Sequence, residues 1–295
     1  MIHYTACPFC NTLNIRKKIS LKDETVSGQY FDVYECLSCT GAFTQNIPLQ
    51  EEVGQYYASS AYVSHSETKQ GLINKLYHAV RTRTLRQKRK LIQKLTGKDK
   101  GSLLDVGCGT GAFLHTMLEA GWDATGLEPD ETARKNAFHL YHVLPLPSSE
   151  IFNLPAEQYD AITMWHVLEH VHQLHEYIDQ LKKLIKPSGK MVIAVPNYTS
   201  DDATHYGKYW AAYDVPRHLY HFSPASMKAL MVRHGMRVVQ CKPMWFDSFY
   251  VSMLSEQYKN GNGNLVAAFF RGLASNITAF SNNEKCSSVI YVIEK

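Results

Sequence analysis

The chain has 295 residues, 45% of them hydrophobic, which is enough for a full core and for one large domain or two unequal ones. The formal net charge of +4 is too small to indicate a polyanionic partner by itself. No apolar run reaches eighteen residues, and the N-terminus lacks the apolar stretch of a signal peptide. We therefore expect a soluble, cytoplasmic protein without a membrane span.

Four of the seven cysteines form two CxxC pairs near the N-terminus. Cys7 and Cys10 make the first pair, and Cys36 and Cys39 make the second, about twenty-five residues later. This pattern predicts a tetrahedral Cys₄ zinc site, with residues 29–35 as a hairpin strand leading into the second pair. A redox pair is the alternative, but neither pair lies in a βαβ context. We predict that residues 1–48 form a zinc ribbon whose zinc is structural.

Residues 49–98 are predicted to be a connecting segment followed by a basic helix. The connection contains Tyr56, Tyr57 and Tyr62, which we expect to cover a bound ligand. The helix over 68–96 carries a run of cations: Lys69, Lys75, Arg81, Arg83, Arg86, Lys88, Arg89, Lys90 and Lys94. A solvated helix face explains these charges most simply, and a nucleic-acid surface is the alternative.

Residues 105–114, DVGCGTGAFL, predict a strand, a glycine turn and a helix. Gly107, Gly109 and Gly111 let the backbone turn sharply and approach a ligand, and the following helix directs its free N–H groups toward that ligand. The loop lacks the Gly-Lys-Ser/Thr of a phosphate-binding P-loop. Its GxGxG spacing also differs from the GxGxxG of dinucleotide-binding loops.

An acidic residue, Glu128, ends the next predicted strand, 123–128, about twenty residues after the loop. In doubly wound folds an acid at this position accepts hydrogen bonds from ribose hydroxyls. A solvated acid at the end of a strand is the alternative interpretation.

Two more motifs follow in the same order. The strand 159–164 leads into WHVLEHV, residues 165–171, and the turn IKPSGK, residues 185–190, precedes a strand over 189–195. Together with the glycine loop and Glu128, they resemble the class I S-adenosylmethionine-dependent methyltransferases. The resemblance implies S-adenosylmethionine as cofactor. It also implies cofactor contacts from Asp105, Gly107, Cys108, Gly109, Gly111, Glu128, Pro129 and Trp165, and from Ser148 after the third strand.

The fold that this resemblance implies is α/β, with a Rossmann-like seven-stranded sheet over residues 99–295, joined to the N-terminal ribbon. The predicted strands are 102–107, 123–128, 140–145, 159–164, 189–195, 236–242 and 287–293, with a helix over 223–234. Residues 243–286 are an insertion rich in aromatic residues. They are expected to form either a substrate wall or additional core.

Histidines are the candidate general bases. His166 follows the fourth strand, and His218 and His221 lie in YDVPRHLYHFS, residues 213–223. A structural role is the alternative for each of them, and His170 and His172 are expected to cap a helix or face solvent. The remaining cysteines, Cys108, Cys241 and Cys286, have no predicted nucleophilic role. The residues after the fourth strand lack the motif of exocyclic-amine methyltransferases.

The PRHLYHFS string and the ribbon resemble a subgroup that includes zinc-containing sugar C-methyltransferases. Those enzymes continue into a further C-terminal domain, so their substrate is not carried over directly. We expect a methyltransferase for a small hydroxylated metabolite, such as a sugar or nucleotide-sugar, with O-methylation favoured over C-methylation. The alternatives are an rRNA base methyltransferase, which would bind nucleic acid, and a non-catalytic module that binds zinc and S-adenosylmethionine.

Overall fold

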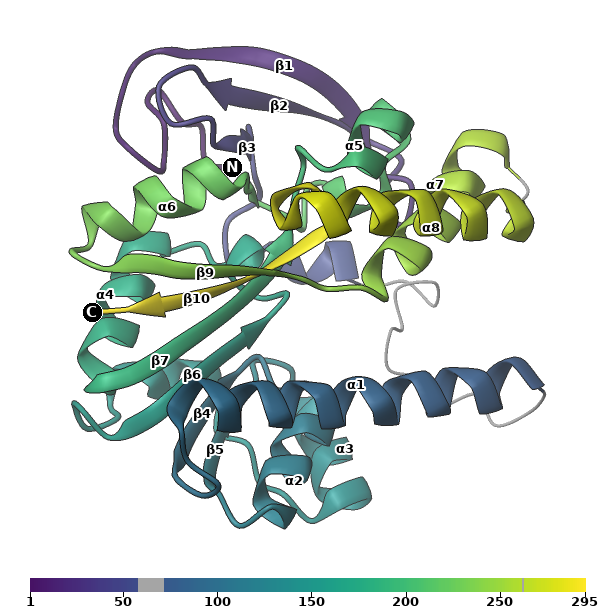
Figure 1. The fold of residues 1–295 in the computed structure, drawn as a ribbon. Coiled ribbons are helices and arrows are strands. Elements are labelled where there is room, and N and C mark those ends of the chain that lie inside the picture. The colour runs from purple at the N-terminus through teal and green to yellow at the C-terminus, as the bar shows by residue number, and fades with distance from the viewer. Residues whose placement is uncertain (58–71, 262) are drawn as a thin grey trace. The chain divides into compact units, whose positions relative to one another are not determined.

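The computed structural model describes residues 1–57, 72–261 and 263–295 (Figure 1). The chain divides into two compact units. Unit 1 comprises Met1–Tyr62, His166–Leu174 and Ile193–Ile293, and unit 2 comprises Val63–Trp165, His175–Val192 and Glu294–Lys295. Of the residues singled out above, Tyr62, Lys69 and the side chain of Lys75 lie outside the described parts. The sequence-based division at residues 48 and 98 stays a prediction, because the compact units follow spatial contact rather than chain order.

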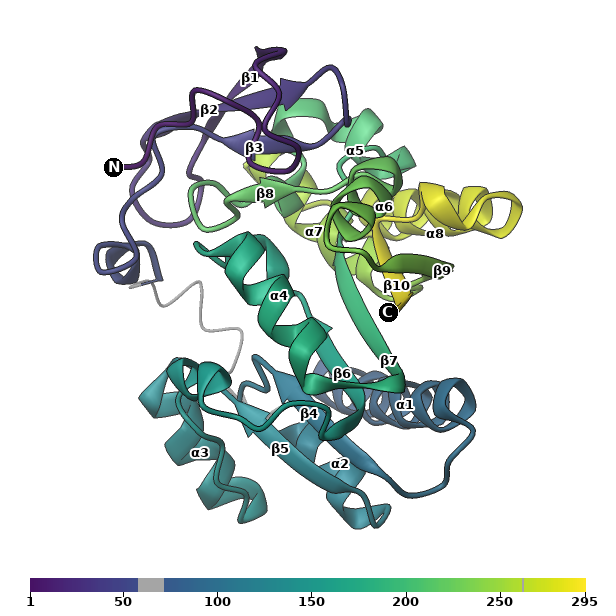
Figure 2. The ribbon, with the colours of Figure 1, turned by 90° about the vertical axis from the view of Figure 1, so that its left-hand side faces the viewer.

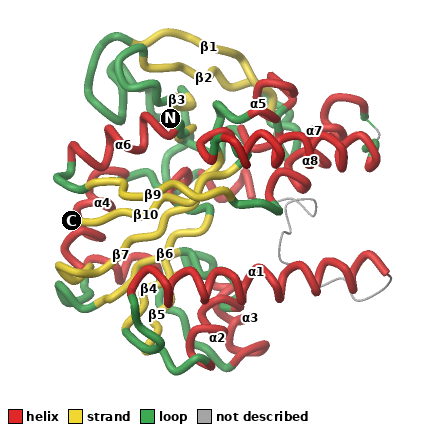
Figure 3. The backbone as a smooth tube through the Cα atoms, in the orientation of Figure 1, coloured by secondary structure: helices red, strands yellow, loops and turns green. Residues whose placement is uncertain are grey.

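Unit 2 begins with the long helix α1, Leu72–Thr96, and continues with alternating strands and helices (Figure 3). Strand β4, Ser102–Val106, pairs in parallel with β5, Asp123–Leu127, on one side and with β6, Tyr159–Trp165, on the other. Helices α2, Ala112–Glu119, and α3, Glu131–Tyr141, follow β4 and β5. Leu103, Leu104 and Ile162 are fully or almost fully buried, as expected for a parallel sheet covered on both faces.

The sheet is mixed and has six strands in the order β5-β4-β6-β7-β10-β9. Its other strands are β7, Ile185–Pro196, β9, Arg237–Pro243, and β10, Ser288–Glu294, and helix α4, Leu174–Leu184, connects β6 to β7. Strands β9 and β10 lie within one residue of their predicted ranges. The prediction of a turn over 185–190 is wrong, because β7 already begins at Ile185.

The predicted strand over 140–145 is wrong. Helix α3 continues to Tyr141, and only Leu146 bridges strand β5, through its pairing with Leu127. Leu146 donates to the carbonyl of Gly126 and accepts from the N–H of Glu128, each at 2.9 Å. In a parallel ladder the next residues to bond β5 would be Leu144 and Ser148. The ladder ends at Leu146 because α3 and its left-handed C-cap His142 take up the chain before it, and Ser148 begins a 3₁₀ turn after it.

Unit 1 contains a second sheet, the ribbon sheet, which takes its name from the predicted zinc ribbon and has the strand order β1-β2-β3-β8 (Figure 2). Strand β1 is Ile15–Lys22, β2 is Tyr30–Cys36, β3 is Ala42–Thr44 and β8 is Tyr220–His221. The predicted hairpin strand over 29–35 is confirmed as β2. Strand β8 comes from the histidine-containing segment and pairs with β3, so the ribbon sheet is completed by residues far along the chain.

The rest of unit 1 is largely helical. Helix α5 is Asp201–Tyr206 and α6 is Pro224–Arg233, which confirms the predicted helix over 223–234. The insertion forms α7, Asp247–Asn260, and α8, Leu265–Ser281, which lie side by side (Figure 1). Short 3₁₀ turns are Val53–Tyr57, Ser148–Phe152, Leu168–His170, Gly207–Tyr209, Ala211–Tyr213 and Asn283–Lys285. Among the described residues, no helix has the length and apolar character needed to cross a membrane.

Some aromatic residues of the insertion pack against one another, and others are exposed. Phe249 of α7 stacks on Phe269 of α8 with ring centroids 5.4 Å apart, and Gly272 leaves room for Phe249 because a Cβ there would lie 2.7 Å from its ring. Phe270 and Phe280 are exposed. The substrate wall stays a prediction.

A buried arginine joins three segments of unit 1. Arg217, 1% exposed, donates to Asp214 at 2.6 Å, to Asp23 at 2.9 Å and to the carbonyl of Tyr56 at 2.9 Å. Asp23 in turn accepts from the backbone N–H groups of its own turn, including that of Ser27 at 2.8 Å. This network connects the β1–β2 hairpin, the connecting segment and the histidine-containing segment.

The Asp23→Asn variant should lower the free energy of unfolding by about 3 kcal/mol, because it leaves the Arg217 guanidinium with one buried partner fewer. Hydrogen bonds from Ser27 and Arg217 outweigh burial and hold the pKa of Asp23 well below its usual value. The stabilisation is therefore present above about pH 4 and is lost as the pH falls below it.

Urea unfolding at pH 7 and pH 3 measures both effects. The exposed Asp99→Asn variant is the control, and we expect it to match the wild type. A loss of less than about 0.5 kcal/mol in Asp23→Asn at pH 7 would contradict a structural role for this pair.

Candidate functional site

The glycine loop of unit 2 adopts the geometry expected from its sequence. Gly107, Gly109 and Gly111 have φ values of 71°, 55° and 79°, in the left-handed region that favours glycine. A Cβ at Gly111 would lie 2.7 Å from a methyl group of Val143. Helix α2 begins directly after Gly111 without a side-chain cap, which leaves its first N–H groups available to a ligand.

The side chain of Glu128, at the end of β5, is hydrogen-bonded to the glycine loop that follows β4. It accepts a hydrogen bond from the N–H of Gly109 at 2.9 Å and another from the N–H of Asp130 at 3.0 Å. The residue is 8% exposed. A carboxylate has about four acceptor positions, so two remain for further donors. The loop and Glu128, which are separated in the sequence, are thus brought together at the carboxyl ends of β4 and β5.

Asp105, at the end of β4, is buried and accepts a hydrogen bond from the hydroxyl of Thr163 at 2.6 Å. Burial raises the pKa of Asp105 to about 7; the charge of Glu128 adds to this rise, while that of Lys88 opposes it. The ring of Trp165 packs edge-on against Phe113, and Nζ of Lys88 lies 4.1 Å from the centroid of the Trp165 ring. The Lys88 ammonium is therefore held over an aromatic face and interacts with the buried Asp105 carboxyl.

The other predicted cofactor residues lie around the same strands. The carbonyl of Pro129 accepts from Arg134 at 2.8 Å. Ser148 begins a 3₁₀ turn two residues after Leu146, which pairs with β5. Burial raises the pKa of the Cys108 thiol far above its usual value, which keeps it protonated and is consistent with no nucleophilic role.

His166, the first residue of unit 1 after β6, has an unusual backbone. Its φ of 58° is in the left-handed region, which is uncommon for a residue other than glycine. The ring lies between two carboxylates: Nδ1 is 3.4 Å from Glu169, and Nε2 is 3.5 Å from Asp247 at the start of α7. Asp247 and Glu169 had no predicted role. Asp247 is about eighty residues from His166 in the sequence, whereas Glu169 lies in the same WHVLEHV segment and its contact with the ring was missed.

The neighbouring residues Glu169 and His170 form a cluster with His218. Nδ1 of His170 lies 3.0 Å from the carbonyl oxygen of Arg217, and Nδ1 of His218 lies 2.9 Å from that of Ala212. The two rings meet edge-to-face with centroids 4.6 Å apart. Burial, reinforced by the neighbouring histidines, holds the pKa of His218 well below its usual value. The expectation that His170 caps a helix or faces solvent is wrong, because its ring is held within this cluster.

His221 lies in a different environment from His218. It is 3% exposed, and its Nε2 lies 3.1 Å from the Thr44 hydroxyl. Its ring packs on Tyr213 at a centroid distance of 5.2 Å, and burial lowers its pKa to about 3. This geometry favours packing of the ribbon sheet over proton transfer. His172 is held by the carbonyl of Pro48 at 3.1 Å.

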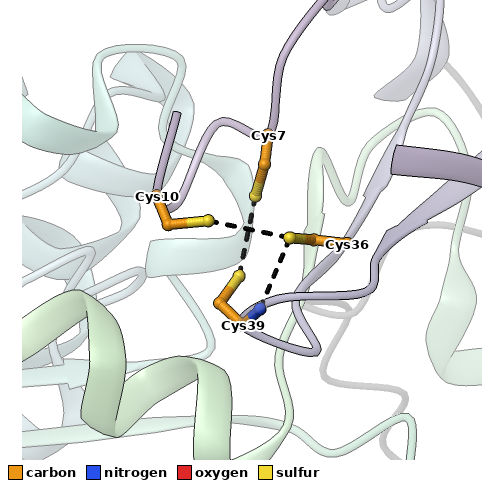
Figure 4. Close-up of side chains that lie close together, drawn as sticks. All are labelled: Cys7, Cys10, Cys36 and Cys39. Carbon is orange, nitrogen blue, oxygen red and sulfur yellow. Dashed lines mark hydrogen bonds between the residues drawn. The ribbon is translucent and has the colours of Figure 1, made fainter. Parts of the chain in front are cut away.

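The four ribbon cysteines converge as predicted (Figure 4). The Sγ atoms of Cys7 and Cys39 are 3.6 Å apart, and so are those of Cys10 and Cys36. A disulfide would require about 2.05 Å, whereas sulfurs around a tetrahedral zinc with Zn–S bonds of about 2.3 Å lie roughly 3.8 Å apart. The N–H of Phe9 points at Sγ of Cys7, and the N–H groups of Ser38 and Cys39 point at Sγ of Cys36, each at 3.4 Å. The residues present fit a zinc ion.

Residues 77–241 match the protein family described as "Methyltransferase domain", which is more than half of the chain. The chain belongs to this methyltransferase family. The fold agrees with a structure described as an S-adenosylmethionine-dependent methyltransferase from Archaeoglobus fulgidus. That comparison has a TM-score of 0.50 at 20% identity, and covers 73% of this chain and 94% of the other.

Two curated relatives of this methyltransferase differ in the substrates that their names give. The ubiquinone biosynthesis O-methyltransferase of Bordetella avium (strain 197N) is 34% identical over 116 residues, or 36% of this chain and 47% of the relative. The tRNA U34 carboxymethyltransferase of Idiomarina loihiensis (strain ATCC BAA-735 / DSM 15497 / L2-TR) is 31% identical over 112 residues, or 35% of each chain. The chain spans about half the length of the curated ubiquinone-pathway relatives it matches.

Proposed function

We propose that this chain transfers a methyl group from S-adenosylmethionine to a hydroxyl group of a small molecule. The cofactor part rests on one observation above all: the Glu128 carboxylate is joined to the positive-φ glycine loop at the carboxyl ends of β4 and β5. Ligands of doubly wound sheets bind at this edge, and an acid there accepts the ribose hydroxyls.

In the proposed mechanism, S-adenosylmethionine supplies the electrophilic methyl group when bound. Glu128 would hold the ribose, and the first N–H groups of α2 would hold the anionic end of the methionine part. Asp105, Gly107, Cys108, Gly109, Gly111, Pro129, Ser148 and Trp165 line this proposed site. His166 takes the proton from the acceptor hydroxyl, while Glu169 and Asp247 orient its ring from either side.

The acceptor is proposed to be a hydroxylated metabolite, and more specifically a sugar or a nucleotide-sugar. The O-methyltransferase name of the ubiquinone-pathway relatives supports a hydroxyl acceptor. A histidine between two carboxylates suits removal of a hydroxyl proton, because the carboxylates stabilise the imidazolium that forms.

RNA is the second candidate acceptor. It is supported by the tRNA-directed relative and by the cationic residues of α1. Lys88, one of those cations, lies over the Trp165 ring, so the basic run is not purely a solvent-facing surface.

The four ribbon cysteines are proposed to hold a structural zinc. Their sulfur spacing and the N–H groups aimed at Cys7 and Cys36 support this assignment. The zinc would fix the two knuckles and the ribbon sheet, with no open position for catalysis.

The Glu128→Ala variant should weaken S-adenosylmethionine binding at least tenfold, because hydrogen bonds to a charged group are worth roughly 1.5–3 kcal/mol each. Isothermal calorimetry measures the affinity. Glu131→Ala, which removes an exposed acid three residues away that pairs only with Lys135 in the described structure, is the matched control and should bind normally. Equal affinity in Glu128→Ala and the wild type would remove Glu128 from the cofactor site.

The His166→Asn variant should lose at least about a hundredfold in methyl transfer while retaining cofactor affinity. Asparagine tolerates the left-handed backbone at this position, so the change is directed at the ring. The assay follows labelled methyl into the small-molecule and RNA fractions of a cell extract, with the exposed His139→Asn as control. Full activity in His166→Asn would refute the proposed base, and nuclease-sensitive label would favour the RNA acceptor.

The Cys36→Ser variant should contain less zinc and melt at a lower temperature than the wild type, because metal binding by a ribbon contributes directly to its folding. Elemental analysis and thermal unfolding measure the two quantities. Cys241→Ser, which lies outside the ribbon, should leave the zinc content unchanged. Retention of a full zinc equivalent by Cys36→Ser would refute the four-cysteine assignment.

A further inference from the structure

A second group of side chains in unit 1 has the composition of a metal site. Glu169, His170 and His218 each offer one ligand atom, and these atoms lie within 4.8 Å of one another. Glu169 and His170 belong to the 3₁₀ turn after β6, and His218 belongs to the segment before β8. Backbone pairing supports this juxtaposition, since the N–H of Leu219 donates to the carbonyl of Glu169 at 2.8 Å.

The Glu169 carboxylate is the first indication that a cation binds here. The residue is 0% exposed, and neither side-chain oxygen has a hydrogen-bond partner among the described residues. Taking a carboxylate out of water is costly unless a nearby charge or hydrogen bond compensates. The ring of His166 lies 3.4 Å from one oxygen, which leaves the other oxygen available to a ligand.

The two histidines are the second indication. Nδ1 of His170 faces the carbonyl of Arg217, and Nδ1 of His218 faces the carbonyl of Ala212. A carbonyl oxygen can only accept, so a hydrogen bond to it places the proton on Nδ1 and leaves the lone pair on Nε2. Nδ1 of His170 also lies 3.0 Å from the Tyr57 hydroxyl, which can share the same contact. This is the arrangement of most metal-binding histidines, whose second ring nitrogen donates to a backbone carbonyl or carboxylate.

We propose that Glu169, His170 and His218 bind a divalent transition-metal ion such as zinc or iron(II). One carboxylate and two imidazoles are a common ligand set for such ions, and bonds of about 2.0–2.2 Å would require the three groups to close slightly around the ion. The site has nitrogen and oxygen ligands, whereas the ribbon has only sulfur. Three protein ligands leave positions open for a hydroxyl oxygen of the acceptor; this last point alone rests on the proposed function.

Titration of the full-length, zinc-loaded protein with Co²⁺ tests the site without cofactor or acceptor, so the result is independent of methyl transfer. We expect the wild type to bind one equivalent of Co²⁺ beyond the ribbon metal. It should show weak visible bands and no added thiolate charge-transfer band in the near ultraviolet. Glu169→Gln and His218→Asn should each weaken this binding at least tenfold. The exposed His139→Asn is the control and should bind as the wild type does.

Glu169→Gln is nearly isosteric, and thermal unfolding without added metal shows whether each variant folds. Added Co²⁺ should raise the melting temperature of the wild type and of His139→Asn, but not that of a folded Glu169→Gln. Should Glu169→Gln fail to fold, His218→Asn decides the matter by the same comparison. Absence of a second equivalent in the wild type would overturn the proposal. Wild-type affinity in a folded Glu169→Gln or His218→Asn would also overturn it.

Discussion

The buried guanidinium of Arg217 is the interaction on which the arrangement of unit 1 most depends. It is shared between Asp23 of the ribbon hairpin and Asp214 of the histidine-containing segment, and it also donates to the carbonyl of Tyr56. A buried charge of this kind is tolerated only when all of its partners are present. The next residue in the chain is His218, so the network that satisfies Arg217 also fixes the backbone that carries one member of the histidine cluster.

The backbone conformation of His166 bears on its proposed role as a base. His166 directly follows strand β6, and its φ of 58° lies in the left-handed region. Such conformations persist where surrounding structure fixes them, and they occur often at functional sites.

The local patterns of the sequence were informative where a short segment determines its own structure. The glycine turn, the two cysteine pairs and the hairpin strand leading to Cys36 all follow from adjacent residues. The missing third strand shows the opposite case. An apolar stretch near residue 143 suggested a strand, but α3 takes up the preceding residues and a 3₁₀ turn begins at Ser148, so only Leu146 pairs with β5.

The candidate site was predictable only in part, because much of it depends on distant contacts. The position of Asp247 beside His166 joins residues about eighty apart, and no local pattern signals it. Strand β8 has two residues, too few for a sequence signal, yet it completes the ribbon sheet. It also places His221 beside Thr44, in a different environment from that of His218. Glu169 was visible in the WHVLEHV motif, but its complete burial depends on the whole of the surrounding fold.

The central claim is that S-adenosylmethionine binds at the glycine loop and Glu128. A crystal structure of the chain with S-adenosylhomocysteine tests it most directly. We expect ribose hydroxyls within hydrogen-bonding distance of the Glu128 carboxylate, and the homocysteine part over residues 107–111 at the N-terminus of α2. A ligand bound elsewhere, or a loop that stays empty at saturating concentration, would contradict cofactor binding at Glu128.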